Sequence, residues 1–324
     1  MIYRILRWIS GIALHWFYRD IRVMNNERIP LSGPLFIAVN HQNALVDSLL
    51  IGWVMPRRVT MTAKATLLGN PVISLLFRLV GVIPLRRASD EVAARTKGPG
   101  TNRSRNEGAF REILDTVENN GAVLIFPEGK SHNEPGLEPL RSGLARLALS
   151  ARDDRSVRSV KILPIGLVFE DKGTPRSVVD VHIGNAVEMD SWAGNDSNEL
   201  TNEISRRLRI LSEQVSMPIV ETRRSTSRSA SLRDFLISIA ARWGRITHEL
   251  PVRFARRLVA RKARDADQPA MLTMVVATGL ALLVYAISFA VVNTLVHSAW
   301  ISALFVASLL LGAYWAAFED HRRA

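Results

Sequence analysis

The segment from Ala270 to Phe318 limits what this chain can fold into, because it contains no Asp, Glu, Lys or Arg. At about 1.5 Å per helical residue, it is long enough to cross a bilayer core of about 30 Å twice. Polar residues interrupt it near the middle, at Asn293, Thr294, His297 and Ser298. The segment therefore predicts a hairpin of two membrane-spanning helices, at about 270–292 and 299–318.

Positively charged residues flank this hairpin on both sides, as RKAR at 261–264 and HRR at 321–323. Loops rich in Lys and Arg stay on the cytoplasmic side of a membrane. We therefore expect both ends of the hairpin, including the tail 319–324, on the cytoplasmic side of a cell membrane. The domain that precedes the hairpin is expected on the same side, and a bacterial inner membrane is the expected setting.

The segment 216–269 concentrates the positive charge of the chain. Between Thr222 and Arg264 there are twelve Lys and Arg residues and two acids, so this stretch carries +10 of the net charge of +12. Apolar residues such as Phe235, Trp243 and Phe254 are interspersed with the arginines. This basic amphipathic pattern predicts a segment that lies on a membrane surface and contacts anionic lipid headgroups. Nucleic-acid binding is the alternative, but no recognisable nucleic-acid module accompanies the segment, and we expect no such partner.

The first eighteen residues are mainly apolar, with Arg4 and Arg7 interrupting the run. They fall short of the about 20 apolar residues that a spanning helix needs. They also lack the uninterrupted apolar core and the small-residue cleavage site of a signal peptide. Residues 1–20 therefore predict an interfacial amphipathic helix. The alternative is a helix that packs into the core of the soluble domain.

Residues 21–215 alternate short apolar runs with helical patterns, which predicts a single domain. Strands are expected at Leu35–Val39, Val82–Leu85, Ala122–Phe126, Ile162–Phe169 and Val178–Ile183. Helices are expected at Ser48–Met55, Asn106–Glu118 and Leu140–Ser150. Strands that alternate with helices predict an α/β fold, with a mixed, largely parallel sheet flanked by helices.

His41 and Asp47 are the first pair of residues that can carry chemistry. His41 follows the expected strand 35–39, and ligands of α/β sheets bind beyond the carboxyl ends of strands. On one regular helix the two residues would point to different faces, so they meet only if His41 lies in a loop before the turn to Asp47. Asp47 could then bind one ring nitrogen and leave the other free to take a proton. The alternative is an Asp that caps a helix beside an unrelated His.

Two further patterns offer cations after predicted strands. Gly81–Arg87 ends in two arginines, which suit bidentate phosphate binding unless they form a solvated strand end. Residues 126–131 read FPEGKS, and the glycine, lysine and serine in this stretch can hold an anion. Position 124 is Leu rather than the Gly that a P-loop requires, so a P-loop is excluded. Arg141, in the stretch that opens the predicted helix Leu140–Ser150, adds another cation.

A fourth pattern, Ile162–Gly166 (ILPIG), is apolar. It is either a strand that lines an acyl or substrate groove or a plain core strand.

The order and approximate spacing of these four patterns resemble the four conserved blocks of the glycerolipid acyltransferases, the lysophosphatidic acid and glycerol-3-phosphate acyltransferases. The match runs from about Pro30 to about Val187, and its specific parts are Asn-His followed by Asp and Phe-Pro-Glu-Gly. The resemblance implies that His41 and Asp47 are the catalytic pair. The residues expected in the acceptor and phosphate site are Arg87, Glu128, Gly129, Lys130, Ser131 and Arg141.

The sequence departs from this family pattern in two places. Five residues, rather than the usual four, separate His41 from Asp47, which resembles a branch that includes glycerol-3-phosphate acyltransferase-like members. Lys130 stands where most members have Thr after Glu-Gly, so recognition of the acceptor's headgroup is expected to differ.

The resemblance implies transfer of a fatty acyl group from an acyl thioester to glycerol-3-phosphate or 1-acylglycerol-3-phosphate, with His41 as general base. The donor, acyl-CoA or acyl-carrier protein, is a co-substrate, and no cofactor or metal is expected. The chain contains no cysteine and no Gly-x-Ser-x-Gly elbow, which agrees with direct transfer without an acyl-enzyme. The alternatives are an acyltransferase for another lysolipid or an amine-containing lipid, or a non-catalytic lipid-binding scaffold.

Overall fold

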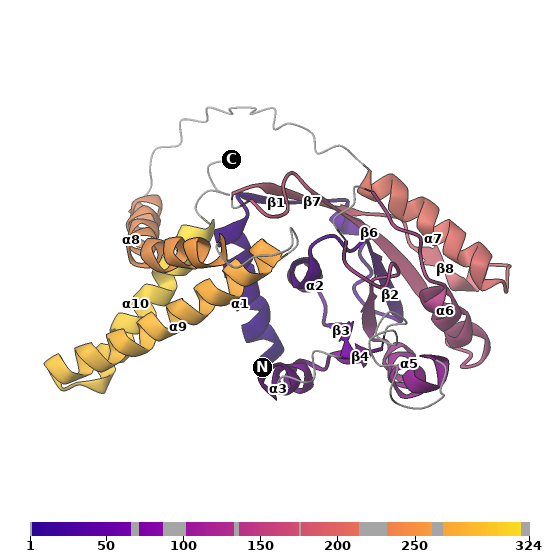
Figure 1. The fold of residues 1–324 in the computed structure, drawn as a ribbon, viewed down its shortest axis with the longest axis horizontal. Helices are drawn as coiled ribbons and strands as arrows, with labels where there is room; N and C mark the ends of the chain where they lie inside the picture. Colours follow the sequence, from indigo (N-terminus) through magenta and orange to yellow (C-terminus); the bar gives the residue numbers. More distant parts are fainter. Residues whose placement is uncertain are drawn as a thin grey trace.

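Figure 1 shows the computed structural model of the chain, which describes residues 2–65, 71–86, 102–132, 136–174, 176–213, 232–260 and 268–318. The described residues form an α/β unit, on the right of the figure, and a group of helices that projects from it on the left.

One mixed sheet forms the centre of the α/β unit. Its strands lie in the order β1-β7-β6-β2-β5-β3-β4, and β8 pairs with β6 beside this path. Neighbours along the order are parallel, except that β6 is antiparallel to β7, as it is to β8. The strands are β1 (Asp20–Met24), β2 (Leu35–Val39), β3 (Val59–Lys64), β4 (Ile83–Leu85), β5 (Ala122–Ile125), β6 (Lys161–Phe169), β7 (Val178–Ile183) and β8 (Val187–Glu188). The predicted fold class, a mixed and largely parallel sheet, is confirmed.

Helices cover both faces of this sheet. The first face is covered by α1 (Ile2–Phe17) and α2 (Ala44–Val54), and the second by α5 (Asn102–Glu118), α6 (Gly143–Asp153) and α7 (Ser197–Ser212). The helix α3 (Pro71–Val80) precedes β4, and short 3₁₀ turns lie at Asn26–Arg28 and Met189–Ser191.

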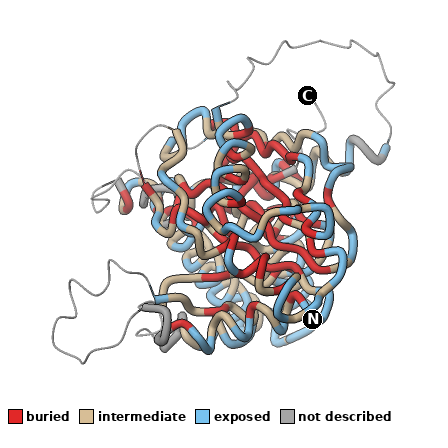
Figure 2. The backbone as a smooth tube through the Cα atoms, turned by 90° about the vertical axis from the view of Figure 1, so that its right-hand side faces the viewer, coloured by how far each residue is buried: buried red, intermediate tan, exposed pale blue. Residues whose placement is uncertain are grey.

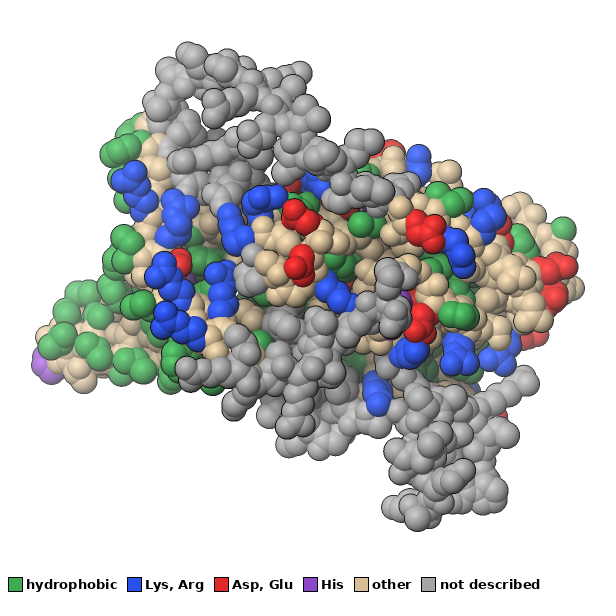
Figure 3. All heavy atoms as spheres, turned by 45° about the horizontal axis from the view of Figure 1, so that its top comes forward, with side chains coloured by type: hydrophobic (Ala, Val, Ile, Leu, Met, Phe, Trp, Pro, Cys, Tyr) green, Lys and Arg blue, Asp and Glu red, His purple; other side chains and the backbone are tan. Residues whose placement is uncertain are grey.

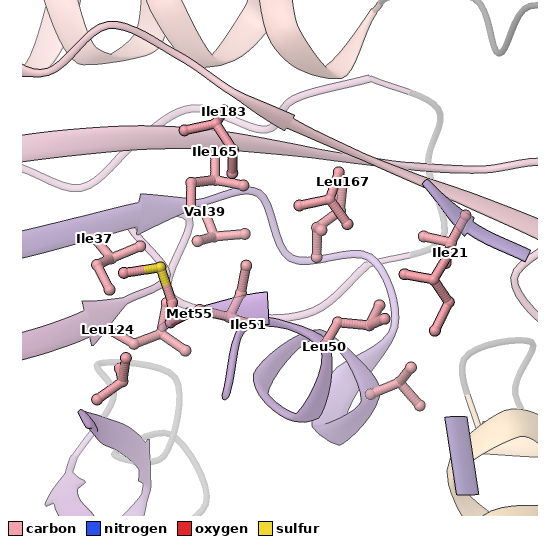
Figure 4. Close-up of a cluster of buried hydrophobic side chains, with 14 of the residues drawn as sticks. Ile21, Ile37, Val39, Leu50, Ile51, Met55, Leu124, Ile165, Leu167 and Ile183 are labelled. Carbon is pink, nitrogen blue, oxygen red and sulfur yellow. The ribbon is translucent and has the colours of Figure 1, made fainter. Parts of the chain in front are cut away.

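The central strand β2 shows why the sequence folds this way. Its residues, LFIAV, are all buried, because apolar cores lie on both sides of it. Ile37 and Val39 pack with α1 and α2, whereas Phe36 and Ala38 pack with α5, α6 and α7. Figure 4 shows the first of these cores, where Leu50 and Ile51 of α2 lie against the strands. Figure 2 shows the buried residues gathered inside the unit.

Five strands and α-helices of the α/β unit lie where the sequence predicted none: β1, β3, β8, α3 and α7. Three predicted helices are present with different bounds. The one expected from Ser48 begins at Ala44, the one expected from Asn106 begins at Asn102, and the one expected from Leu140 begins at Gly143.

The helix α1 has two unlike halves. Near its C-terminal end, Leu14 and Phe17 are buried in the first core. Near its N-terminal end, Ile2, Ile5 and Trp8 are exposed. The helix thus packs into the α/β unit at one end, as the alternative interpretation of this segment proposed, and presents apolar side chains to the surroundings at the other.

The two apolar helices at the C-terminal end form the expected hairpin. These are α9 (Gln268–Val296) and α10 (Ala299–Phe318), and by length and composition each could cross a membrane. In Figure 3 this hairpin is the largely hydrophobic projection at the left, and Lys and Arg side chains gather near its base. The flanking charges at 261–264 and 321–323 lie outside the described residues.

The basic segment contains a long helix, α8 (Leu232–Ala260), which packs against both helices of the hairpin. Gly244 of α8 and Gly312 of α10 lie against each other, because a Cβ atom on Gly244 would collide with the Gly312 carbonyl oxygen. Small residues allow helix backbones to approach this closely. Residues 214–231 and 261–267 of the segment lie outside the described residues.

Candidate active site

The site lies where three neighbouring strands end. The strands β6, β2 and β5 are adjacent and parallel, so the loops that follow them emerge at the same edge of the sheet. His41 follows β2, Glu128 follows β5, and Lys172 follows β6. Side chains that are far apart in the sequence therefore meet at the carboxyl ends of the strands, the usual place for a site in an α/β sheet.

The structure brings His41 and Asp47 together. His41 Nδ1 lies 2.9 Å from Asp47 Oδ2. His41 lies in the loop after β2, Asp47 lies in the first turn of α2, and the chain turns between them at Ala44, whose φ is 44°. The backbone N–H of Asn43 donates to the same Asp47 oxygen over 2.8 Å, which fixes the carboxylate in place.

Burial and stacking fix the orientation of the His41 ring. Asp47 is 0% exposed and His41 is 6% exposed. The ring of Phe126 stacks on that of His41, with centroids 3.9 Å apart and planes 16° from parallel. A carboxylate can only accept, so Nδ1 carries the proton and Nε2 keeps its lone pair when the ring is neutral. The arrangement can therefore take a proton at Nε2.

Glu128 is buried under the His41 loop and faces protein donors. Its Oε1 accepts the backbone N–H of His41 over 2.6 Å. Its Oε2 accepts the N–H of Glu138 over 2.9 Å and a hydrogen bond from His132 Nε2. Both oxygens are thus used within the protein, and the carboxylate is 2% exposed. In this arrangement Glu128 holds the main chain of His41, a role that the sequence did not suggest.

The residues that follow Glu128 lie at the surface. Lys130 is exposed and forms an ion pair with Glu138, with Nζ 3.0 Å from Oε2. Gly129 has a φ of 78°, which favours glycine, and Arg141 Cγ would lie 3.6 Å from a Cβ atom there. Ser131 is half-buried, and Arg141 is exposed. Lys130 and Arg141 are therefore two cations on the rim of the loop that contains Glu128.

Two candidates from the sequence remain, Arg87 and the apolar stretch Ile162–Gly166. Arg87 lies outside the described residues. The stretch Ile162–Gly166 lies within β6 and is buried throughout, so it is a core strand of the sheet.

Three residues of this region were not among the candidate site residues of the sequence. Asn40 holds the start of the loop to β6, with Nδ2 2.9 Å from Leu167 O and Oδ1 2.7 Å from Leu167 N. Tyr18, at the end of α1, accepts a hydrogen bond from Asn43 Nδ2 over 2.9 Å. Burial raises the pKa of Tyr18 well above its usual value, and the nearby Asp47 charge adds to this, so the hydroxyl keeps its proton. Lys172 is the third. Of the three, only Asn40 belongs to a pattern visible in the sequence, the Asn-His pair.

Comparisons with known proteins agree with the resemblance in the sequence. Residues 20–168 match the family model described as Acyltransferase. The chain is 24% identical over 265 residues to glycerol-3-phosphate O-acyltransferase 1 of Saccharomyces cerevisiae, covering 58% of this chain and 35% of that protein. It is 26% identical over 164 residues to a 1-acyl-sn-glycerol-3-phosphate acyltransferase of Haemophilus influenzae, covering 48% and 59%.

A solved structure is also similar. The crystal structure of the 1-acyl-sn-glycerophosphate acyltransferase PlsC from Thermotoga maritima matches with 18% identity and a TM-score of 0.49, covering 64% of this chain and 77% of that one. The chain spans about a third and about three fifths of the lengths of the two curated relatives. The resemblance of the sequence to the glycerolipid acyltransferases is confirmed, and residues 20–168, which match the family model, resemble an acyltransferase domain.

Proposed function

We propose that this chain transfers a fatty acyl group from an acyl thioester to a hydroxyl of glycerol-3-phosphate or 1-acylglycerol-3-phosphate. The acyltransferase domain gives the class of reaction, and the relatives that it resembles are named for these two acceptors. The observation that carries the proposal is the buried hydrogen bond of 2.9 Å between His41 Nδ1 and Asp47 Oδ2, at the carboxyl end of β2.

This pair supports a direct acyl transfer. Asp47 holds the His41 ring so that Nε2 takes the proton of the acceptor hydroxyl as its oxygen attacks the thioester carbonyl carbon. A tetrahedral oxyanion forms, the carbon–sulfur bond breaks, and the sulfur leaves with the proton that His41 returns. The products are the ester and the free thiol of CoA or of a carrier protein, and His41 is neutral again.

The acceptor's phosphate needs cations close to this pair. Lys130 and Arg141 are both exposed on the loop that follows β5, the strand next to β2. A lysine and an arginine on one loop suit a phosphate group. We assign them to the phosphate site together with Arg87, to which the family resemblance gives the same role, and Gly129 and Ser131 complete the loop.

The helices outside the domain support a place at a membrane surface. Exposed apolar side chains follow one another along one side of α8 at intervals of three and four residues, at Phe235, Ile239, Trp243, Ile246, Leu250 and Phe254. Arg242, Arg253 and Arg257 are exposed beside them. Such a helix lies at a membrane interface, with its arginines at anionic headgroups. With the hairpin inserted and positive charges at both of its ends, the domain would stay on the cytoplasmic side, where the lipid product enters the bilayer.

The test is acyl transfer by the full chain in detergent. Labelled acyl-CoA is offered with glycerol-3-phosphate and, separately, with lysophosphatidic acid. The variants are His41→Ala and a matched control, His297→Ala, which removes an exposed histidine at the tip of the hairpin. We expect transfer to one acceptor, a loss of about 10²- to 10⁴-fold in His41→Ala, and wild-type activity in His297→Ala.

This assay identifies the acceptor and also tests whether His41 is the general base. Activity that survives in His41→Ala would exclude His41 as the base. If folded protein transfers to neither acceptor, with either CoA or carrier-protein thioesters and with other lysolipids or amine-containing lipids, the proposal is wrong and a lipid-binding scaffold is the better interpretation.

A further inference from the structure

Lys172 lies in the loop between β6 and β7, among residues that several hydrogen bonds hold in place. Asp171 organises this loop, because its carboxylate accepts the N–H groups of Gly173 and Thr174 and the hydroxyl of Thr174, over 3.0, 3.2 and 2.7 Å. These bonds, the Thr174 hydroxyl first, lower the pKa of Asp171. Ser177 Oγ donates to the Asp171 carbonyl oxygen over 2.6 Å. The main chain of Lys172 is therefore held in one position.

The side chain of Lys172 joins the two loops that build the site. Its Nζ lies 2.9 Å from the carbonyl oxygen of Gln42, the residue after His41. It lies 3.0 Å from the carbonyl oxygen of His132, in the loop that contains Glu128. Both are charge-assisted hydrogen bonds, which are stronger than those between neutral groups. One ammonium group thus crosslinks the main chains of these two loops.

The main chain of Lys172 adds contacts to the same region. Its carbonyl oxygen accepts a hydrogen bond from Asn43 Nδ2 over 3.0 Å and one from the Tyr18 hydroxyl over 3.4 Å. Asn43 in turn donates its N–H to Asp47. Residues 42 and 43 are therefore both bound to Lys172, one through its side chain and the other through its main chain.

We propose that Lys172 is a positioning residue of the acyl transfer, which clamps the His41 loop to the loop of Glu128 and His132. The inference rests on the proposed function, and it adds a residue from outside the matched acyltransferase domain. The ammonium group has no role in the chemistry itself. It keeps the His41 main chain fixed between Glu128, which binds its N–H, and Gln42, whose carbonyl the clamp holds.

Kinetics of Lys172→Met test this role, because methionine is unbranched, ends where the Cε atom of lysine lies, and lacks the ammonium group. A displacement of about 1 Å of a catalytic group lowers a rate about 100-fold, so we expect kcat to fall about 10- to 100-fold. The KM for the acceptor should change less than about threefold. An increase in that KM with kcat retained would instead make Lys172 an acceptor ligand and overturn the proposal.

Two further variants control this measurement. Lys161→Met removes an ammonium group at the other end of β6, where Lys161 pairs with Glu188, and should leave kcat unchanged. Lys172→Arg keeps a cation with several donors and should lose less activity than Lys172→Met. A Lys172→Arg enzyme no more active than Lys172→Met would show that the charged donor is not what matters.

Hydrogen exchange tests the clamp without relying on activity. The N–H of His41 binds Glu128, and the N–H of His132 binds the carbonyl oxygen of His41 over 3.2 Å. We expect both amides to exchange at least tenfold faster in Lys172→Met than in the wild type, whereas amides of β6 and β7 keep their rates. Unchanged exchange at both amides, or faster exchange throughout the sheet, would overturn the proposal. If the wild type is inactive but the local effect is seen, the clamp stands and the proposed function fails.

Discussion

Replacing Glu128 with glutamine separates two roles for this residue. The family resemblance assigns it to the acceptor site, whereas the structure shows its two oxygens bound to His41, Glu138 and His132. A glutamine has one oxygen and one NH₂ group in place of two oxygens. Its oxygen can keep the bonds from His132 and Glu138, but its NH₂ group then faces the N–H of His41.

The size of the effect follows from this geometry. One charge-assisted hydrogen bond, of about 1.5–3 kcal/mol, is lost, and two buried donors are left facing each other. We expect the free energy of unfolding of Glu128→Gln to fall by about 3 kcal/mol. The main chain of His41 loses its fixed acceptor, so we expect kcat to fall about 100-fold, the effect of a shift of about 1 Å in the base.

Steady-state kinetics and denaturant unfolding of the full chain in detergent measure the two effects. The control is Glu188→Gln, because Glu188 is half-exposed, pairs with Lys161 over 2.8 Å and lies far from the carboxyl ends of β2 and β5. It should change the free energy of unfolding by less than about 1 kcal/mol and leave kcat unchanged. If Glu128→Gln raises the KM for the acceptor and keeps kcat and stability, Glu128 contacts the acceptor and the reasoning is refuted.

Three further changes test other parts of the structure. Asp47→Asn should lower kcat about 10²- to 10⁴-fold in the acyl-transfer assay, because an amide can present a donor to His41 Nδ1; a near-normal kcat would contradict this. Ala44→Gly should raise the free energy of unfolding by about 1 kcal/mol, measured with denaturant, because φ at this position is 44°; a loss of stability would count against the turn as described. Hydrogen bonds from Arg206, the larger effect, and from Arg207 lower the pKa of Glu203 to about 2. The stability that this ionised carboxylate adds to the folded state is therefore complete above the usual pKa of 4.5 and is lost as the pH falls through about 2. Denaturant unfolding should therefore show wild type more stable than Glu203→Gln at pH 7, by up to about 1 kcal/mol, with the difference shrinking towards pH 2; a constant difference would exclude the ion pair as its source.

The strands that the sequence predicted best are those buried on both faces. Leu35–Val39 and Val178–Ile183 have the predicted bounds, because a short apolar run has to be covered on both sides. The strands β1 (DIRVM) and β3 (VTMTAK) mix polar with apolar residues and carry no such signal. They are strands because β7 and β5 lie beside them and pair with their backbones.

The candidate site was predictable only in part. His41 and Asp47 could be paired from the sequence because they lie within one strand, one loop and one helical turn, so local geometry decides whether they meet. The role of Glu128 could not be predicted, because the same carboxylate at a loop end could face a ligand or a backbone N–H. Lys172 carried no pattern at all.

The sequence by itself determined the local features of this protein: an uncharged hairpin, a basic amphipathic helix, buried strands and a histidine that follows one of them. Each depends on neighbours within about one element, where periodicity and charge are sufficient. The tertiary structure alone decided that β6, β2 and β5 are adjacent, and hence that the loops with Lys172, His41 and Glu128 touch. Sheet order is set by the packing of the two cores and by strand pairing between distant segments, and hydrogen bonds such as that from Lys172 to Gln42 exist only once that order is established.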